Sequence, residues 1–229
     1  MYELFITNKN YSSWSLRPWV LMRELGIPFT ERLQQLAVGS SWALFRTFSP
    51  SGRMPCLRDG ATVVWDSLAI TEYLADRHAA VWPRDAAARA WARSAAAEMH
   101  SGFAALRDLC SMSCGLRVRL ADVPQVVASD IARIDELWAG GLESFGGPFL
   151  TGRAFTAADA FYAPVAFRWQ TYGFTFGATS THYARRLLAL PAMQAWYADA
   201  LAEPWREPAH EAEARRAGAW LEDQRARSA

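Results

Sequence analysis

The chain has 229 residues and a net charge of +1, and 52% of its residues are hydrophobic and 21% charged. A near-zero net charge gives no general attraction to nucleic acid or to an anionic membrane, while the length is generous for one domain and sufficient for two small ones. Three irregularly spaced cysteines, the absence of a signal-peptide pattern and the lack of a long apolar stretch make a soluble cytoplasmic protein the default expectation.

Residues 1–80 alternate between strand and helix signals. "YELFI" predicts a strand, "SLRPWVLMRELG" a helix that stops at Gly26, and "PFTERLQQL" a second strand. "MPCLRDGATVVW" predicts a hairpin around Asp59-Gly60, and "DSLAITEYLADRH" predicts an amphipathic helix. This order favours a small α/β layer with mixed strand pairing.

From about Pro83 the pattern becomes helical. Helices are predicted in "DAAARAWARSAAAEMHSGFAALRDL", "VPQVVASDIARIDELWAGGLESF", "TAADAFYAPVAFRWQ" and "PAMQAWYADALAEP". No strand pattern is visible there, so we expect an all-helical second domain over residues 86–215, packed on the first. The last segment, residues 213–229, is expected to fray.

Three serines stand near the start of the first helix, at Ser12, Ser13 and Ser15. One serine suffices to cap a helix, so capping explains only part of the pattern. A hydroxyl at a helix N-terminus can also stabilise a thiolate, because both the helix dipole and the hydrogen bond favour the charged form.

Two further motifs have both an ordinary and a functional interpretation. Pro55 begins a predicted strand, which is common, but a cis Met54–Pro55 bond would turn the Met54 backbone groups into a cleft, where they can pair with an extended peptide. Asp66 and Ser67 begin a helix and are ordinary caps. They also suit an amino-acid head group, since Ser67 can donate to its carboxylate and Asp66 can accept from its ammonium.

Together the three motifs describe a cleft that holds an extended thiol tripeptide, and they resemble the cytosolic glutathione S-transferases of the serine type. "YSSWSLR" resembles the zeta-class signature, the class of maleylacetoacetate isomerase. "SPSGRMPCL" resembles the family's cis-proline segment, and "WDSLAITEYL" its glutathione clamp. "FLTGRAFTAADAFYAPV" resembles the family's capping box, Thr156 to Asp159, to which we give a structural role.

The resemblance implies an α/β plus all-α fold: a thioredoxin-like first domain with a mixed four-stranded sheet, then a helical bundle domain. It implies glutathione as co-substrate, no metal, a homodimer, and an electrophilic small molecule bound between the domains. By position, Ser12 is the catalytic hydroxyl. The glutathione-binding set is Ser12, Arg53, Met54, Pro55, Asp66 and Ser67.

The sequence also departs from the family pattern. Trp14 replaces the zeta-class cysteine, and no Cys-x-x-Cys occurs, which disfavours redox chemistry. Asp66 stands where Glu or Gln is commoner. Tyr11 competes with Ser12 for the catalytic role, because other classes of the family use a tyrosine at the end of the first strand. Tyr11 lies well past the end of the predicted strand, so Ser12 is preferred, and Ser13 and Ser15 are minor candidates.

Several other residues have open interpretations. Cys110 and Cys114 share a helix face if the helix persists, and they are interpreted as core or cleft thiols or as half of a metal site. His100 is expected at a helix surface or interface. The family position of the long helix suggests Met99, Phe103 and Arg107 as specificity residues. The aromatic cluster of Trp169, Tyr172, Phe174 and Phe176 is predicted to form packing or a pocket wall, with packing favoured.

The sequence thus predicts a glutathione S-transferase that activates the glutathione thiolate for attack on an electrophile. One alternative is a glutathione-dependent cis–trans isomerase of the maleylacetoacetate or maleylpyruvate type, in which Arg17 or another cleft arginine holds a dicarboxylate. The other is a non-catalytic binding protein of the same family. No nucleic-acid or membrane partner is expected.

Overall fold

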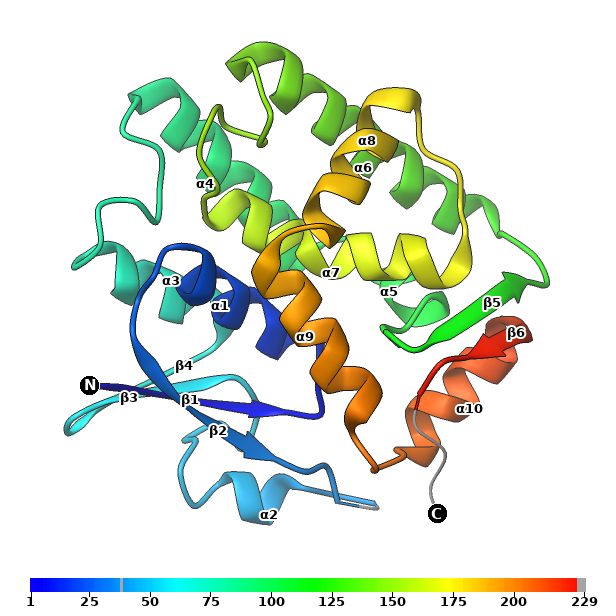
Figure 1. The fold of residues 1–229 in the computed structure, drawn as a ribbon, viewed down its shortest axis with the longest axis horizontal. Helices are drawn as coiled ribbons and strands as arrows, with labels where there is room; N and C mark the ends of the chain where they lie inside the picture. Colours follow the sequence, from blue (N-terminus) through cyan, green and yellow to red (C-terminus); the bar gives the residue numbers. More distant parts are fainter. Residues whose placement is uncertain (38, 226–229) are drawn as a thin grey trace.

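The computed structural model describes residues 1–37 and 39–225, and its elements gather into two units that pack side by side (Figure 1). The first unit contains the sheet, and the second contains the long helices. Among the described residues, no helix combines the length and the apolar character needed to cross a membrane.

The first unit is a four-stranded sheet with helices packed against it. Its elements are β1 (Tyr2–Thr7), α1 (Ser13–Glu24), β2 (Phe29–Gln34), the short α2 (Trp42–Phe45), β3 (Cys56–Asp59), β4 (Thr62–Trp65) and α3 (Ser67–Ala75). The strand order is β2-β1-β3-β4, with β1 parallel to β2 and the other pairs antiparallel. The mixed four-stranded sheet predicted from the sequence is therefore confirmed.

The central strand β1 is covered on both faces, which explains its nearly continuous apolar sequence. Leu4 and Ile6 are fully buried, and on the opposite face Phe5 stacks on Phe48 with ring centroids 4.6 Å apart. A strand buried on both faces loses the alternation of polar and apolar residues that marks a half-exposed strand.

The second unit is mainly helical. It comprises α4 (Ala86–Ser101), α5 (Ala104–Leu109), β5 (Leu116–Leu120), α6 (Gln125–Phe145), α7 (Ala157–Tyr172), α8 (Ala178–Leu188), α9 (Pro191–Ala202), α10 (Pro208–Ala217) and β6 (Gly218–Asp223). The helix α7 is buried along almost its whole length and packs against α1, α4 and α8. Its capping box between Thr156 and Asp159 is present, as predicted.

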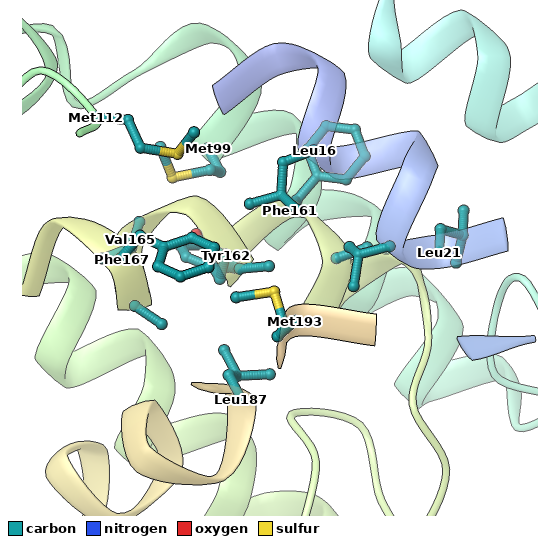
Figure 2. Close-up of a cluster of buried hydrophobic side chains, with 14 of the residues drawn as sticks. Leu16, Leu21, Met99, Met112, Phe161, Tyr162, Val165, Phe167, Leu187 and Met193 are labelled. Carbon is teal, nitrogen blue, oxygen red and sulfur yellow. The ribbon is translucent and has the colours of Figure 1, made fainter. Parts of the chain in front are cut away.

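One continuous core joins the two units. Figure 2 shows Leu16 of α1 next to Phe161 of α7, with Tyr162 of α7 and Met193 of α9 close by, and all four are fully buried. Because α1 begins at the serine-rich segment, this shared core fixes the start of α1 relative to the helical unit.

Three sequence expectations for the helical unit are wrong in detail. The unit is not all-helical, because β5 and β6 pair as an antiparallel ribbon. The predicted helix over residues 85–109 is two helices, because Phe103 takes a left-handed conformation with φ +56° after Gly102. No helix continues through residues 110–114, so Cys110 and Cys114 do not share a helix face.

The expected fraying of residues 213–229 is also wrong for its described part, while residues 226–229 lie outside the described residues. Trp220 of β6 packs under the guanidinium of Arg215, 3.8 Å from its ring centroid, and Arg225 is buried. Arg225 forms ion pairs with Asp223 and Glu211, at 2.7 Å and 2.6 Å. Charged residues in this segment are ordered because they pair with one another and with an aromatic ring.

The single lysine of the chain, Lys9, joins the two units just before α1. Its side chain is almost completely buried, and its Nζ lies 2.8 Å from Glu31 of β2 and 2.6 Å from Asp199 of α9. The ammonium also lies over the rings of Trp19 and Trp196, 5.0 Å and 5.5 Å from their centroids. Ion pairing and cation–π contact thus compensate the burial of the charge.

The backbone around Lys9 is tied to α9 as well. The Glu203 carboxylate accepts from the Lys9 and Asn10 N–H groups at 2.6 Å and 3.3 Å, and Trp196 Nε1 donates to the Lys9 carbonyl at 2.9 Å. These contacts fix the loop that leads from β1 into the serine-rich segment.

We expect Lys9→Met to lower the free energy of unfolding by about 1–3 kcal/mol, because two carboxylates lose the cation between them. Urea denaturation measures this. The matched control is Arg32→Met, which breaks the more exposed pair with Glu3 and is expected to cost less than about 1 kcal/mol. Equal losses in the two variants would contradict a structural role for Lys9.

Candidate functional site

A cleft opens where the start of α1 meets the helical unit. Its larger hollow, of about 580 Å³, is lined by residues including Ser12, Ser13, Met54, Arg107 and Arg168. A neighbouring hollow of about 470 Å³ is lined by Met54, Pro55, Asp66, Ser67 and Arg107, among others.

The two hollows share four lining residues: Trp14, Arg53, Met54 and Arg107. All six predicted site residues therefore line one connected cleft, with Ser12 in the larger hollow and the other five at the smaller one. Loops and helix starts from three separate parts of the sequence converge here.

Ser12 caps α1 and is coupled to Ser15. The Ser12 Oγ accepts from the Ser15 N–H at 3.3 Å, and its own O–H donates to the Ser15 Oγ at 2.7 Å. Ser15 is fully buried and also accepts from the Thr7 N–H at 3.3 Å. A hydroxyl proton can rotate, so Ser15 can instead donate to Ser12 and leave the Ser12 O–H to donate into the cleft.

Tyr11 directs its hydroxyl away from Ser12, into the C-terminal segment. The Tyr11 O–H donates to Glu211 at 2.9 Å and its oxygen accepts from Arg225 at 2.8 Å and from the Glu207 N–H at 3.4 Å. Burial raises the pKa of Tyr11 to about 12. The phenol is thus occupied in holding the C-terminal segment.

The Met54–Pro55 peptide bond is cis, as the functional interpretation of this motif predicts. The turn before it is held by Ser49, whose O–H donates to the Arg53 carbonyl at 2.7 Å. Outside the strand ladders, no hydrogen bond among the described residues engages the Met54 backbone.

Asp66 and Ser67 begin α3 at the smaller hollow. Asp66 caps the helix, since its Oδ1 accepts from the N–H groups of Leu68 and Ala69 at 2.7 Å and 3.4 Å. Its Oδ2 lies 3.5 Å from His100 Nε2. His100 therefore stands at the interface between the two units, which is one of the two positions predicted for it from the sequence. Capping thus uses one carboxylate oxygen, and the other faces the His100 ring in a residue that lines the smaller hollow.

Arg17 lies behind Ser67. It is almost fully buried, with its Nη1 3.4 Å from the Ser67 Oγ and its guanidinium carbon 4.2 Å from the Trp14 ring centroid. Burial, together with the charges of Arg107 and Arg168, lowers its pKa to about 9. A positive charge therefore stands directly behind the start of α3.

Of the three residues suggested from the family position of the long helix, only Arg107 lines the cleft. Its guanidinium lies 4.7 Å from the Trp14 ring centroid, and its Nη1 donates to the carbonyls of His100 and Gly102. Met99 and Phe103 are buried in the core instead, because the break at Gly102 turns Phe103 inward.

The three cysteines are buried free thiols. Burial raises the pKa of Cys110 to about 12, and it raises the pKa of Cys114 well above its ordinary value. Among the described residues, no group of three or more metal-ligating side chains comes together. Cys110 and Cys114 are fully buried in the core, which is one of the two thiol placements expected from the sequence.

The predicted packing role of the aromatic cluster is confirmed. Tyr172, Phe174 and Phe176 are buried members of the core, and Trp169 packs against it. Arg168 of α7 is a cleft residue for which the sequence alone predicts no role. The available signal was a single arginine inside the otherwise apolar run "FYAPVAFRWQ", and only the fold places it beside Ser13, with its Nη2 3.4 Å from the Ser13 Oγ.

Comparison with known proteins points in one direction. Residues 11–77 match the family described as glutathione S-transferase, N-terminal domain. Glutathione S-transferase theta-3 of Mus musculus is 28% identical over 147 residues, which cover 60% of this chain and 58% of that protein. The chain thus matches less than two thirds of that relative's length.

Solved structures extend the likeness to the helical unit. The theta-class glutathione S-transferase of Xanthomonas axonopodis pv. citri, with glutathione bound, is 25% identical with a TM-score of 0.62, covering 86% of this chain and 96% of that one. A glutathione transferase homologue from Burkholderia gl BGR1, with bound glutathione, is 20% identical with a TM-score of 0.64, covering 87% and 97%. At 20% identity, the second match supports only the similarity of fold.

We expect Tyr11→Phe to loosen the C-terminal segment, because Glu211 and Arg225 lose a shared hydrogen-bond partner. Hydrogen–deuterium exchange of α10 and β6 should accelerate by about fivefold or more, since a hydrogen bond to a charged group contributes roughly 1.5–3 kcal/mol. The matched control is Tyr73→Phe, which removes the tyrosine hydroxyl bonded to Asp59. Unchanged exchange in the Tyr11 variant would refute the assignment.

Proposed function

We propose that this chain is a member of the cytosolic glutathione S-transferase family, which its matches resemble, and that it binds reduced glutathione and transfers the thiolate to an electrophilic small molecule. The observation that carries the proposal is the convergence of Ser12, Met54, Asp66 and Ser67 on one cleft. The relatives named above with glutathione bound support glutathione as the ligand.

The start of α3 binds the γ-glutamyl end in this proposal. Asp66 accepts from the ammonium with the carboxylate oxygen that capping leaves over, and Ser67 donates to the carboxylate. Arg17 supports the same interaction, because its buried guanidinium lies behind Ser67 and raises the local positive potential.

The middle of the tripeptide runs along the turn at Met54. The Met54 N–H and C=O pair with the backbone of the glutathione cysteine as an added strand would, and Arg53 and Pro55 complete the wall of the smaller hollow. This pairing orients the cysteine side chain toward the start of α1.

The start of α1 stabilises the thiolate. Ser12 donates its proton to the sulfur while Ser15 donates to Ser12, and the free N–H groups at the helix start favour the negative charge. The thiol proton leaves to solvent, and the sulfur is held next to the larger hollow, where the electrophile binds.

The zeta-like signature remains a resemblance of residues 11–17, since two of the relatives named above are of the theta class. A detoxification role, a cytoplasmic location and a homodimer are parts of the same proposal. The dimer has one structural support: β4 and α3 leave an apolar hollow of about 550 Å³ beside the exposed Trp65, which a second copy could cover.

We expect Ser12→Ala to raise the pKa of bound glutathione by about 1–2 units, because a hydrogen bond to a charged group contributes roughly 1.5–3 kcal/mol and one unit corresponds to about 1.4 kcal/mol. The measurement is a pH titration of thiolate ultraviolet absorbance in the complex. In the wild type the bound pKa should lie below that of free glutathione, so the thiolate is present at lower pH.

Two controls separate the hydroxyl from the helix cap. Ser12→Gly also removes the hydroxyl but costs the cap only a few tenths of a kcal/mol, so it should raise the pKa as much as Ser12→Ala does. Ser13→Ala should leave it unchanged. An unshifted pKa in both Ser12 variants would rule out Ser12, and no binding at millimolar glutathione would favour the non-catalytic binding protein.

We expect Asp66→Asn to weaken glutathione binding by about five- to tenfold, because the ammonium loses a partly exposed ionic partner. Asparagine retains the helix cap, so the variant tests charge alone. Asp85→Asn is the matched control, since Asp85 caps α4 in the same way away from the cleft. Calorimetric titration with glutathione measures both, and equal affinities would contradict the role of Asp66.

A further inference from the structure

Arg168 brings a buried positive charge to the larger hollow. Its side chain is only 4% exposed, its Nε donates to the Cys110 carbonyl at 2.7 Å, and its Nη2 lies 3.4 Å from the Ser13 Oγ. Its Nη1 has no hydrogen-bond partner among the described residues, although the guanidinium lines the hollow. Buried charges in proteins are ordinarily paired.

No carboxylate compensates this charge. Within residues 1–37 and 39–225, no Asp or Glu oxygen lies within 4 Å of a nitrogen of Arg17, Arg107 or Arg168. Burial and the charge of Arg107 lower the pKa of Arg168 to about 10. The guanidiniums thus repel one another at a site where an added anion would be attracted.

A second unpartnered group stands nearby. The Ser111 Oγ has no hydrogen-bond partner among the described residues, although Ser111 is only 6% exposed and lines the same hollow. Its position is fixed by α7, because Tyr172 donates to the Ser111 carbonyl at 2.8 Å while Arg168 holds the adjacent Cys110 carbonyl. The helix α7 therefore carries the free guanidinium N–H and also holds the short segment that bears the free hydroxyl.

The larger hollow also has acidic lining residues, which stand on other helices. Asp108 is exposed at the end of α5, and Glu207 is occupied by His210, whose Nδ1 lies 2.6 Å away and whose N–H donates at 2.7 Å. Glu213 lies on α10. Asp108 faces Arg107, and Glu213 lies near Tyr172 of α7, but neither carboxylate comes within 4 Å of an Arg168 nitrogen.

We propose that the electrophilic substrate carries a carboxylate, which Arg168 binds together with the Ser111 hydroxyl and the neighbouring Arg107. The inference rests on the proposed transferase function of the same cleft. Glutathione has carboxylates of its own, but its predicted partners Pro55, Asp66 and Ser67 line the smaller hollow, whereas Arg168 and Ser111 line only the larger one.

The reaction used as a test is conjugate addition to an aryl enone. The thiolate sulfur forms a bond to the β-carbon, the electron pair of the C=C bond moves onto the carbonyl oxygen, and a proton from water then adds to the α-carbon. The thiol proton released on ionisation balances the proton taken up, so no oxidant or further reactant is needed.

The experiment compares two acceptors that differ in charge alone: benzylideneacetone with a para-carboxylate and its para-carboxamide. The kcat/KM of each is divided by its uncatalysed rate with glutathione. The wild type should prefer the carboxylate by about tenfold or more, since a hydrogen bond to a charged group contributes roughly that factor or more. Arg168→Gln should reduce the preference to within about twofold.

Three further variants keep the result interpretable. Ser111→Ala removes a hydroxyl that bonds no described protein group, so it should fold normally and lower the preference by about threefold. Arg168→Lys retains the charge and should retain part of the preference. Arg186→Gln removes an exposed arginine of α8 and should leave the preference intact.

Other outcomes would overturn the proposal. Equal normalised rates for the two acceptors in the wild type would exclude a carboxylate site and leave the transferase function standing. A preference that survives Arg168→Gln and Ser111→Ala would assign it to other residues. A raised KM for glutathione with an unchanged preference would mean that Arg168 binds a carboxylate of glutathione.

A binding measurement separates this inference from the proposed function. Calorimetry compares the two acceptors with and without S-methylglutathione, which cannot react. If neither acceptor is conjugated, the transferase proposal fails. About tenfold tighter binding of the carboxylate, lost in Arg168→Gln, would then still support the anion site, and equal binding of the two acceptors would refute it.

Discussion

The buried ammonium of Lys9 ties the end of β1 to Glu31 of β2 and to Asp199 of α9, and the loop that carries it leads directly into Tyr11 and Ser12. The same loop also organises the far wall of the cleft. The Asn10 carbonyl accepts from the Cys114 N–H at 3.1 Å, and its side-chain oxygen accepts from the Gly115 N–H at 3.0 Å. One loop therefore sets both the start of α1 and the segment that bears Ser111. The geometry of the cleft follows from how this loop is held.

The helix caps at the cleft have a structural and a chemical use at once. Ser12 and Asp66 satisfy N–H groups at the starts of α1 and α3, which any helix start requires. Each keeps a second capacity: a rotatable proton on Ser12, and a second oxygen on Asp66. Capping therefore does not exclude ligand binding, because a cap uses only part of what the side chain can donate or accept.

Positive charge is the second organising feature of the cleft. Arg17, Arg107 and Arg168 come from three different helices, and two of the three are almost fully buried. Aromatic faces and backbone carbonyls hold the guanidiniums, with Trp14 lying between Arg17 and Arg107. Such neutral partners fix a guanidinium in place without cancelling its charge. A cleft built in this way favours negatively charged ligands and the negatively charged form of a thiol.

The sequence by itself determined the features that depend on neighbouring residues: the four strands of the first unit, its helices α1 and α3, the Asp59-Gly60 hairpin, the caps at Ser12 and Asp66, and the capping box at Thr156. Periodicity and capping act over a few residues, so they can be read locally. Tertiary structure decided the rest. The engagement of Tyr11 by Arg225, the burial of Lys9 and the place of Arg168 all join residues far apart in the chain. The order of α10 and β6 depends on the same kind of contact, because a charged segment gives no apolar pattern and is held only by partners that the fold brings to it.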